Sequence, residues 1–215
     1  MKLLIMRHAE SRGNASGDYS VRSHDSLSPR GREQASSVVC CLRAHDFDEI
    51  LVSPLQRALE TIAPYLEATD RRAEIWPEIA EACWQEREEE PSESWNTRPA
   101  SVPDHLARFF SFRNGEAIRP ADPESFGEGL RRAHQTLVRV QGIAATPDHS
   151  VLMITHGHFI RELLNLILDT RRLVGFPHDN CGMTSLTFDG AWRMDFCNCR
   201  GNIDESNKPE AGEGK

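Results

Sequence analysis

The chain opens on Leu3-Leu4-Ile5-Met6-Arg7-His8, a short apolar run that ends in an arginine and a histidine. A second run of this kind, Val151-Leu152-Met153-Ile154, ends in Thr155-His156. Short apolar runs followed by helix-like sequence are typical of buried parallel strands. Because groups at the carboxyl ends of parallel strands share one crevice, we expect His8 and His156 to meet there.

The rest of the chain repeats this alternation of strand and helix. Further strands are expected near 49–53 and 73–76, and helices are expected to start at Ser28-Pro29 and Ser53-Pro54, where serine can cap and proline can open a helix. The second of these helices carries apolar residues at helical spacing from Leu55 to Leu66. Alternating strands and helices predict an α/β protein with a mainly parallel sheet.

Two segments depart from the alternation. From Gln85 to Pro123 the pattern breaks down, and we interpret 85–123 as an insertion that covers the carboxyl edge of the sheet, with a short helix around Leu106, Phe109 and Phe110. Near the end, segments 183–188 and 191–196 flank Asp189-Gly190, a signal for a type I′ hairpin. We therefore expect one domain over 1–199 and a polar, disordered tail over 200–215.

Composition limits the partners that the protein can have. The 215 residues are 39% hydrophobic and 27% charged, as in a globular domain, and the net charge of −8 argues against a general nucleic-acid binder. No apolar stretch approaches the ~20 residues of a membrane span. We expect no nucleic-acid or membrane partner, although an exposed sheet edge at the 183–196 hairpin could pair two copies into a homodimer.

The compartment is predicted from the N-terminus and the cysteines. Arg7, His8 and Glu10 interrupt an apolar start that could otherwise pass for a signal peptide. Six cysteines without a secreted-protein context are expected to be reduced thiols, with a zinc site as the alternative, although the spacing of Cys197-x-Cys199 is too tight for the usual zinc knuckle. Both observations favour a cytoplasmic protein.

Five short motifs together resemble one known family. They are Arg7-His8-Ala9-Glu10-Ser11-Arg12-Gly13-Asn14, Leu27-Ser28-Pro29-Arg30-Gly31, Ser53-Pro54-Leu55-Gln56-Arg57-Ala58, Thr155-His156-Gly157 and Asn180-Cys181-Gly182-Met183-Thr184. In this order they resemble the histidine phosphatase superfamily, which includes the cofactor-dependent phosphoglycerate mutases. The resemblance implies a three-layer α/β/α sandwich of the phosphoglycerate mutase type.

The resemblance also implies roles for individual residues. His8 would be the nucleophile and become phosphorylated, while Arg7, Arg57, His156 and Asn14 would hold the oxygens of the phosphate. Arginine suits this task because its planar fork stays charged and binds phosphate oxygens in pairs. Other motif residues are expected in the substrate-binding site, namely Ser11, Gly13 and Gly157.

The leaving oxygen needs a proton donor, which the resemblance places on a glutamate. Glu81 is the expected donor, and Glu78 and Glu86 are the alternatives, because the glycine usual in this segment is absent. A nearby dianionic substrate would raise the pKa of Glu81 and favour its protonated form. His158 stands where many relatives have a small residue, so it could line the pocket, cap the helix or face solvent.

These expectations together predict a metal-independent phosphatase that acts on a small phosphomonoester, without a cofactor. His156 and His158 could be metal ligands, but no third ligand stands at short spacing, so we predict no metal site. Phosphoglycerate mutase activity is one alternative, although mutases usually carry tryptophan where this chain has Gly13. A phosphate-binding scaffold without catalysis is the other.

Overall fold

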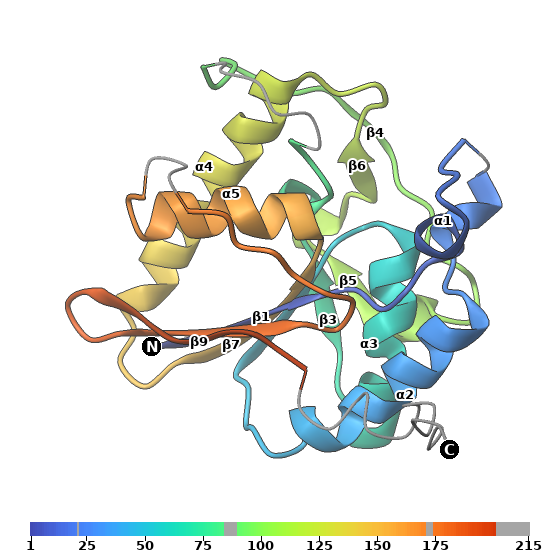
Figure 1. The fold of residues 1–215 in the computed structure, drawn as a ribbon, viewed down its shortest axis with the longest axis horizontal. Helices are drawn as coiled ribbons and strands as arrows, with labels where there is room; N and C mark the ends of the chain where they lie inside the picture. The colour runs from blue at the N-terminus through green and yellow to red at the C-terminus, as the bar shows by residue number, and fades with distance from the viewer. Residues whose placement is uncertain (21, 84–89, 171–173, 201–215) are drawn as a thin grey trace, which may run out of the picture.

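A seven-stranded sheet runs through the centre of the molecule (Figure 1). The computed structural model describes residues 1–20, 22–83, 90–170 and 174–200. The strand order is β5-β3-β2-β7-β1-β8-β9, in which β5, β3, β2, β7 and β1 are parallel and β8 and β9 are antiparallel. The strands are β1 (Lys2–Arg7), β2 (Glu49–Val52), β3 (Ala73–Ile75), β5 (Phe110–Phe112), β7 (Ser150–Thr155), β8 (Met183–Phe188) and β9 (Trp192–Cys199). The predicted α/β fold with a mainly parallel sheet is confirmed.

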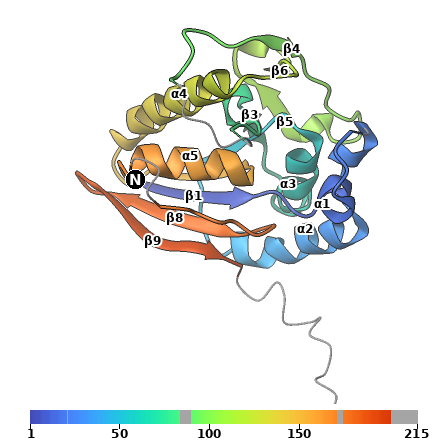
Figure 2. The same cartoon turned by 45° about the horizontal axis from the view of Figure 1, so that its top comes forward.

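Helices cover both faces of this sheet (Figure 2). Side chains alternate along β1, so that Leu4 and Met6 pack in one core with α2 (Pro29–Leu42) and α3 (Gln56–Thr69). Leu3 and Ile5 point the other way, into a second core with α4 (Phe126–Ala144) and α5 (Gly157–Ile167). The strand is apolar at successive positions because both of its faces are buried. The expected three layers are therefore present.

The two serine–proline signals have different outcomes. Ser28 caps α2, its hydroxyl oxygen accepting a hydrogen bond from the amide of Gly31 at 2.9 Å. The helix after Ser53 instead begins at Gln56, with Leu55 at the cap position and no side-chain cap. The predicted start at Ser53-Pro54 is therefore wrong, because the Ser53 hydroxyl is used elsewhere, at the carboxyl end of the sheet.

The segment predicted as an insertion is partly built into the main sheet. Its strand β5 pairs with β3, which the sequence did not predict. Two other strands, β4 (Thr97–Pro99) and β6 (Ile118–Pro120), form a separate antiparallel pair. The expected short helix is only a 3-10 turn over Ala107–Phe109. Residues 84–89 of the predicted insertion lie outside the described ranges.

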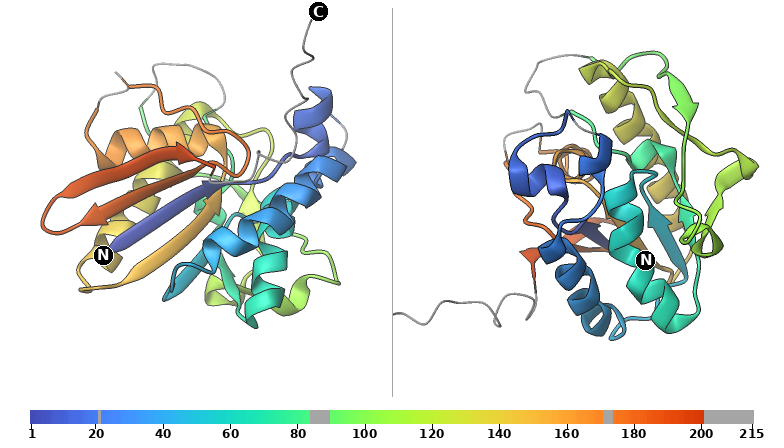
Figure 3. Two further views of the ribbon diagram at one scale, coloured as in Figure 1. Left: turned by 60° about the horizontal axis from the view of Figure 1, so that its bottom comes forward. Right: turned by 90° about the vertical axis from the view of Figure 1, so that its right-hand side faces the viewer.

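The C-terminal hairpin forms as expected, but its turn is different. Phe188 pairs with Trp192, so the loop has three residues, and of Asp189 and Gly190 only Gly190 has a positive φ (104°). A type I′ turn needs two such residues, so that prediction is wrong. Strand β9 forms one edge of the sheet (Figure 3). The predicted tail lies, apart from residue 200, outside the described ranges.

None of the helices in the described ranges combines the length and apolar character needed to cross a membrane.

Candidate active site

Three neighbouring parallel strands bring a polar side chain to the same edge of the sheet. His8 follows β1, Ser53 follows β2 and His156 follows β7, which lies between the other two strands. Backbone hydrogen bonds continue past the strand ends, from the His8 amide to the Thr155 carbonyl at 2.9 Å and from the Ser53 amide to the Ile154 carbonyl at 3.0 Å. The ring centroids of His8 and His156 lie 5.0 Å apart, and both side chains are buried. The strand ends therefore place the two imidazoles together, as expected.

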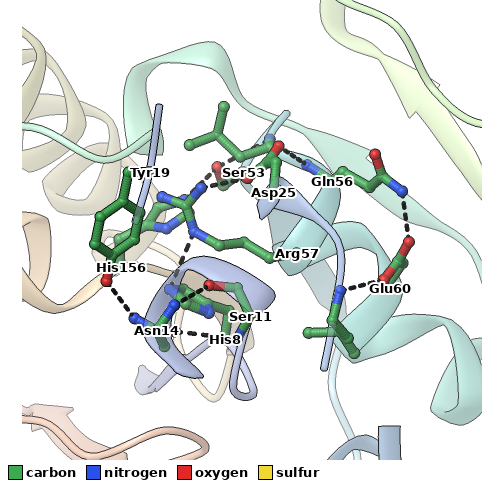
Figure 4. Close-up of polar contacts among 12 residues, drawn as sticks. His8, Ser11, Asn14, Tyr19, Asp25, Ser53, Gln56, Arg57, Glu60 and His156 are labelled. Atoms are coloured by element: carbon green, nitrogen blue, oxygen red, sulfur yellow. Dashed lines mark hydrogen bonds and ion pairs between the residues drawn. The ribbon is translucent and has the colours of Figure 1, made fainter. Parts of the chain in front are cut away.

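The contacts of His8 define which of its ring nitrogens is free to react. Its Nδ1 lies 2.7 Å from the carbonyl oxygen of Ala9, and Arg57 Nε donates to its Nε2 over 3.2 Å (Figure 4). A guanidinium can only donate, so this network assigns the ring proton to Nδ1 and a lone pair to Nε2. Burial, followed by the charges of Arg57 and Arg7, lowers the pKa of His8 well below 6.5. A neutral imidazole with an unprotonated nitrogen is suited to nucleophilic attack.

Arg57 supplies the cationic group beside that nitrogen. It lies in the first turn of α3, where the N-terminus of the helix adds partial positive charge. Its Nη1 forms an ion pair with the carboxylate of Asp25, which also accepts a hydrogen bond from the Gln56 amide at 2.9 Å (Figure 4). The side chain of Arg57 is only 14% exposed. The guanidinium thus bridges the reactive ring and an anion that comes from the chain itself.

Two further polar groups near the rings lack a hydrogen-bond partner within the described ranges. They are His156 Nδ1 and Arg7 Nε, both buried. Each side chain is fixed by its other nitrogen, because His156 Nε2 lies 2.6 Å from Ser53 Oγ and Arg7 Nη1 donates to the His178 carbonyl at 2.6 Å. Burial, then the charge of Arg57, lowers the pKa of His156 well below 6.5. Phosphate oxygens would satisfy both groups.

Gly157 lies beside Arg7, in the first turn of α5. A Cβ at position 157 would lie 3.4 Å from Arg7 Nε, at the short end of ordinary van der Waals contact. Gly157 therefore shapes the space around the guanidinium, and its direct contact with substrate stays a prediction.

The loop after β1 holds Asn14 next to His8. In the short helix α1 (Arg12–Ser16), Ser11 Oγ accepts from the Asn14 amide at 3.0 Å and Asn14 Oδ1 accepts from the Ser11 amide at 3.1 Å. Asn14 Nδ2 donates to the Tyr19 hydroxyl at 2.9 Å, and a Cβ on Gly13 would lie 2.6 Å from the Tyr19 ring. Ser11 and Gly13 thus position Asn14 and Tyr19, and their own contact with substrate stays a prediction.

The three candidate glutamates have different surroundings. Glu81 Oε1 accepts from the Phe159 amide at 3.2 Å, at the N-terminus of α5, and Glu81 Oε2 lies 3.8 Å from His158 Nδ1. Glu78 is buried in an ion pair with Arg139 of α4 at 2.8 Å. Glu86 lies outside the described ranges. Of the two carboxylates that are described, only Glu81 lines the same cavity as Arg57.

The unliganded site keeps Glu81 ionised. Burial alone would raise the pKa of Glu81, but the contact with His158, the charge of Arg57 and the Phe159 amide together lower it below 4.5. The predicted rise of this pKa depends on a bound dianion, so it stays a prediction.

A cavity of about 730 Å³ opens beside these groups. Arg57 and Glu81 line it, together with Asp25 and residues of the β4–β6 pair. His8 is buried and is connected to this cavity through its contact with Arg57. The β4–β6 pair stands at the same end of the molecule as α1 (Figure 2).

Three residues of this site were not predicted from the sequence. Ser53 follows a strand just as the two histidines do, so its position alone could have identified it. Asp25 comes from a loop and carries no such signal, whereas Asn180 opens the motif over 180–184, which could have identified it. Asn180 Nδ2 donates to the His8 carbonyl at 3.0 Å and to Asn14 Oδ1 at 3.2 Å, which ties the loop before β8 to the loop after β1.

No group of three or more His, Cys, Asp or Glu side chains in the described part of the chain is arranged to hold a metal ion.

Comparison with known proteins places the whole arrangement in one family. The model of the histidine phosphatase superfamily (branch 1) matches residues 3–199. The adenosylcobalamin/alpha-ribazole phosphatase of Salmonella typhimurium is 27% identical over 168 residues, which is 78% of this chain and 80% of that protein. A shorter match to the protein of the same name from Salmonella typhi is 37% identical over 81 residues, or 38% of this chain and 40% of the relative.

Solved structures agree on the fold. A phosphoserine phosphatase variant from Entamoeba histolytica, in complex with phosphoserine, superposes with a TM-score of 0.63 at 20% identity and covers 93% of this chain and 97% of its own. Phosphoric monoester hydrolase is the class of enzyme that these relatives indicate. The chain belongs to the histidine phosphatase superfamily, because the family model matches residues 3–199 and the fold places two imidazoles at the carboxyl edge of the sheet.

Proposed function

We propose that this protein hydrolyses small phosphomonoesters through a phosphohistidine formed on His8. The observation that carries the proposal is the neutral His8 ring, whose unprotonated Nε2 lies 3.2 Å from the Arg57 guanidinium. A lone pair beside a fixed cation is what attack on a phosphate dianion requires, because the cation offsets the charge of the incoming group.

The first step transfers the phosphoryl group to the enzyme. His8 Nε2 attacks phosphorus, the bond to the leaving oxygen breaks, and that oxygen takes a proton from Glu81. Arg57, Arg7, His156 and Asn14 are proposed to hold the phosphate oxygens during this transfer. The unpartnered Nδ1 of His156 and Nε of Arg7 support this assignment.

The second step returns the enzyme to its starting state. Glu81, now ionised, takes a proton from water while the water oxygen attacks phosphorus, and the P–N bond breaks to release inorganic phosphate and neutral His8. The lowered pKa of Glu81 in the unliganded site keeps this carboxyl group ionised, which is the form that can accept a proton.

Hydrolysis of p-nitrophenyl phosphate without added metal tests the proposal. We expect turnover in the wild type, its loss in His8→Ala, and full turnover in His45→Ala, since His45 is an exposed histidine outside the cavity. Rapid acid-free quenching with ³²P-labelled substrate should show a phosphohistidine in the wild type and in His45→Ala, and none in His8→Ala. Phosphoglycerate interconversion without hydrolysis would instead indicate a mutase, and silence in both assays a scaffold.

We also propose that the protein works in the cytoplasm. The six cysteines form no disulfide within the described ranges, which supports a reducing compartment. A homodimer through the edge strand β9 stays a prediction, and light scattering coupled to gel filtration would test it.

A further inference from the structure

Two arginines face each other on the β4–β6 pair. Arg98 of β4 and Arg119 of β6 are register partners in this antiparallel pair, and both line the cavity that contains Arg57 and Glu81. Like charges directly opposite one another on two strands are destabilising. A short, isolated two-stranded sheet gains little stability of its own, so this repulsion calls for a compensating anion.

The carboxylates that line the cavity do not supply that anion to Arg119. Asp25 is paired with Arg57, and Glu124 is paired with the buried Arg132 at 2.5 Å. Glu81 contacts the Phe159 amide at 3.2 Å and His158 at 3.8 Å. Asp122 pairs with Arg98 at 3.4 Å, where both side chains are largely exposed. Arg119 takes part in none of the ion pairs formed within the described ranges.

Arg119 is also the less hydrated of the two guanidiniums. Its Nε is buried and has no hydrogen-bond partner among the described residues. Burial, then the charge of Arg98, lowers the pKa of Arg119, and the carboxylates of Asp25 and Asp122 only partly oppose this. A half-buried guanidinium without a partner is a group that a ligand anion would satisfy.

We propose that Arg119, assisted by Arg98, binds a second anionic group of the substrate. The preferred substrates are then phosphomonoesters that carry a carboxylate or a second phosphate on the side away from the ester that is cleaved. This inference rests on the proposed function, because it assumes that the first phosphate lies between His8 and Arg57 and that the remainder of the substrate extends into the cavity.

Matched substrates test the proposal. Each pair differs only in the second anion: 3-phosphoglycerate against glycerol 3-phosphate for a carboxylate, and fructose 1,6-bisphosphate against fructose 1-phosphate for a phosphate. In the wild type we expect kcat/KM to be at least about tenfold higher for the charged member of one pair, since a charge-assisted contact is being added. The pair that shows this preference identifies the anion.

Variants then assign the preference to the β4–β6 pair. For the substrate pair that shows the preference, Arg119→Gln should lower the ratio of the two kcat/KM values about tenfold. Arg98→Gln should lower this ratio less, because the Arg98 side chain is 42% exposed and already pairs with Asp122. Arg108→Gln is the matched control: this arginine belongs to the same segment but pairs with Glu67 on the surface, and the ratio should not change. A wild type without preference in either pair, or an Arg119→Gln variant with an unchanged ratio, overturns the proposal.

The two proposals fail in different ways. If His8→Ala still hydrolyses p-nitrophenyl phosphate, the phosphohistidine is wrong, whereas the substrate ratios still report on Arg119. If no ester is hydrolysed, calorimetric titration of 3-phosphoglycerate and of glycerol 3-phosphate into the full chain measures the same preference as binding. Binding of 3-phosphoglycerate that is tighter than that of glycerol 3-phosphate supports the second anion site, provided that Arg119→Gln abolishes the difference. Equal binding of the two compounds to the wild type overturns it.

Discussion

Replacing Arg57 separates the two contributions that its side chain makes. Arg57→Lys keeps the positive charge but has one terminal nitrogen in place of the planar fork. It can therefore replace at most one of the two contacts that the guanidinium makes, with His8 Nε2 and with Asp25. Arg57→Met removes both contacts and the charge, while its side chain keeps a similar apolar length.

The expected magnitudes follow from these contacts. Loss of one aligned donor typically costs about 3 kcal/mol of transition-state stabilisation, so Arg57→Lys should lower kcat by about 10²-fold and Arg57→Met by 10³-fold or more.

The variants should also differ in pH dependence. After burial, the charge of Arg57 is the strongest influence that lowers the pKa of His8. Its removal raises that pKa, so the acid limb of kcat/KM should move to higher pH in Arg57→Met and stay in place in Arg57→Lys.

Steady-state hydrolysis of p-nitrophenyl phosphate between about pH 4 and 8 measures both effects. Because all variants are assayed with the same substrate, ionisation of the substrate's phosphate affects each pH profile equally and does not contribute to the difference between them. Thermal unfolding of each variant serves as the folding control, because Arg57→Met leaves Asp25 without its partner. Full kcat in Arg57→Lys, or an acid limb in Arg57→Met at or below that of the wild type, would refute the assigned role of the guanidinium.

Three other predictions concern neighbouring groups. Glu81→Gln should lower kcat for alkyl phosphates by about 10²-fold or more, because their leaving oxygen needs a proton. Glu78→Gln is the control and should keep wild-type kcat, since Glu78 pairs with Arg139 outside the cavity. Ser53→Ala removes the hydroxyl that fixes His156 Nε2, so we expect about a tenfold lower kcat with KM nearly unchanged, and restoration of activity in Ser53→Thr. The free energy of unfolding should fall as the pH drops below 6.5, because both histidines take up protons in the unfolded chain but resist protonation when buried in the folded protein. Chemical denaturation should show a loss of about 1 kcal/mol for each of the two histidines between pH 6.5 and 5.5. In His8→Asn the total loss should be smaller.

The parts of this fold that sequence reasoning predicted are those with a strong periodic signal. Runs such as Leu3–Met6 and Val151–Ile154 identify buried strands, and the residue that follows each strand is placed by the topology of a parallel sheet. This is why the meeting of His8 and His156 could be expected from residues far apart in the chain.

The parts that could not be predicted depend on contacts made by irregular segments. Strand β5 has three residues and becomes a strand only because β3 presents a free edge to it. The Asp25–Arg57 ion pair depends on how the loop after α1 folds back onto α3, and nothing in the local sequence encodes that path. Ser53 was assigned to a helix cap, a local role, when a partner distant in sequence, His156, determines its place.

The carboxylate of Asp25 gives the resting enzyme an internal counter-ion. Where a substrate phosphate exchanges with this carboxylate at Arg57 Nη1, the free energy of binding is the difference between two ion pairs and not the full strength of one. We expect the same exchange to assist the end of the catalytic cycle, since Asp25 competes with inorganic phosphate for the guanidinium and limits product inhibition. An Asp25→Asn enzyme should accordingly be inhibited by inorganic phosphate at lower concentrations than the wild type.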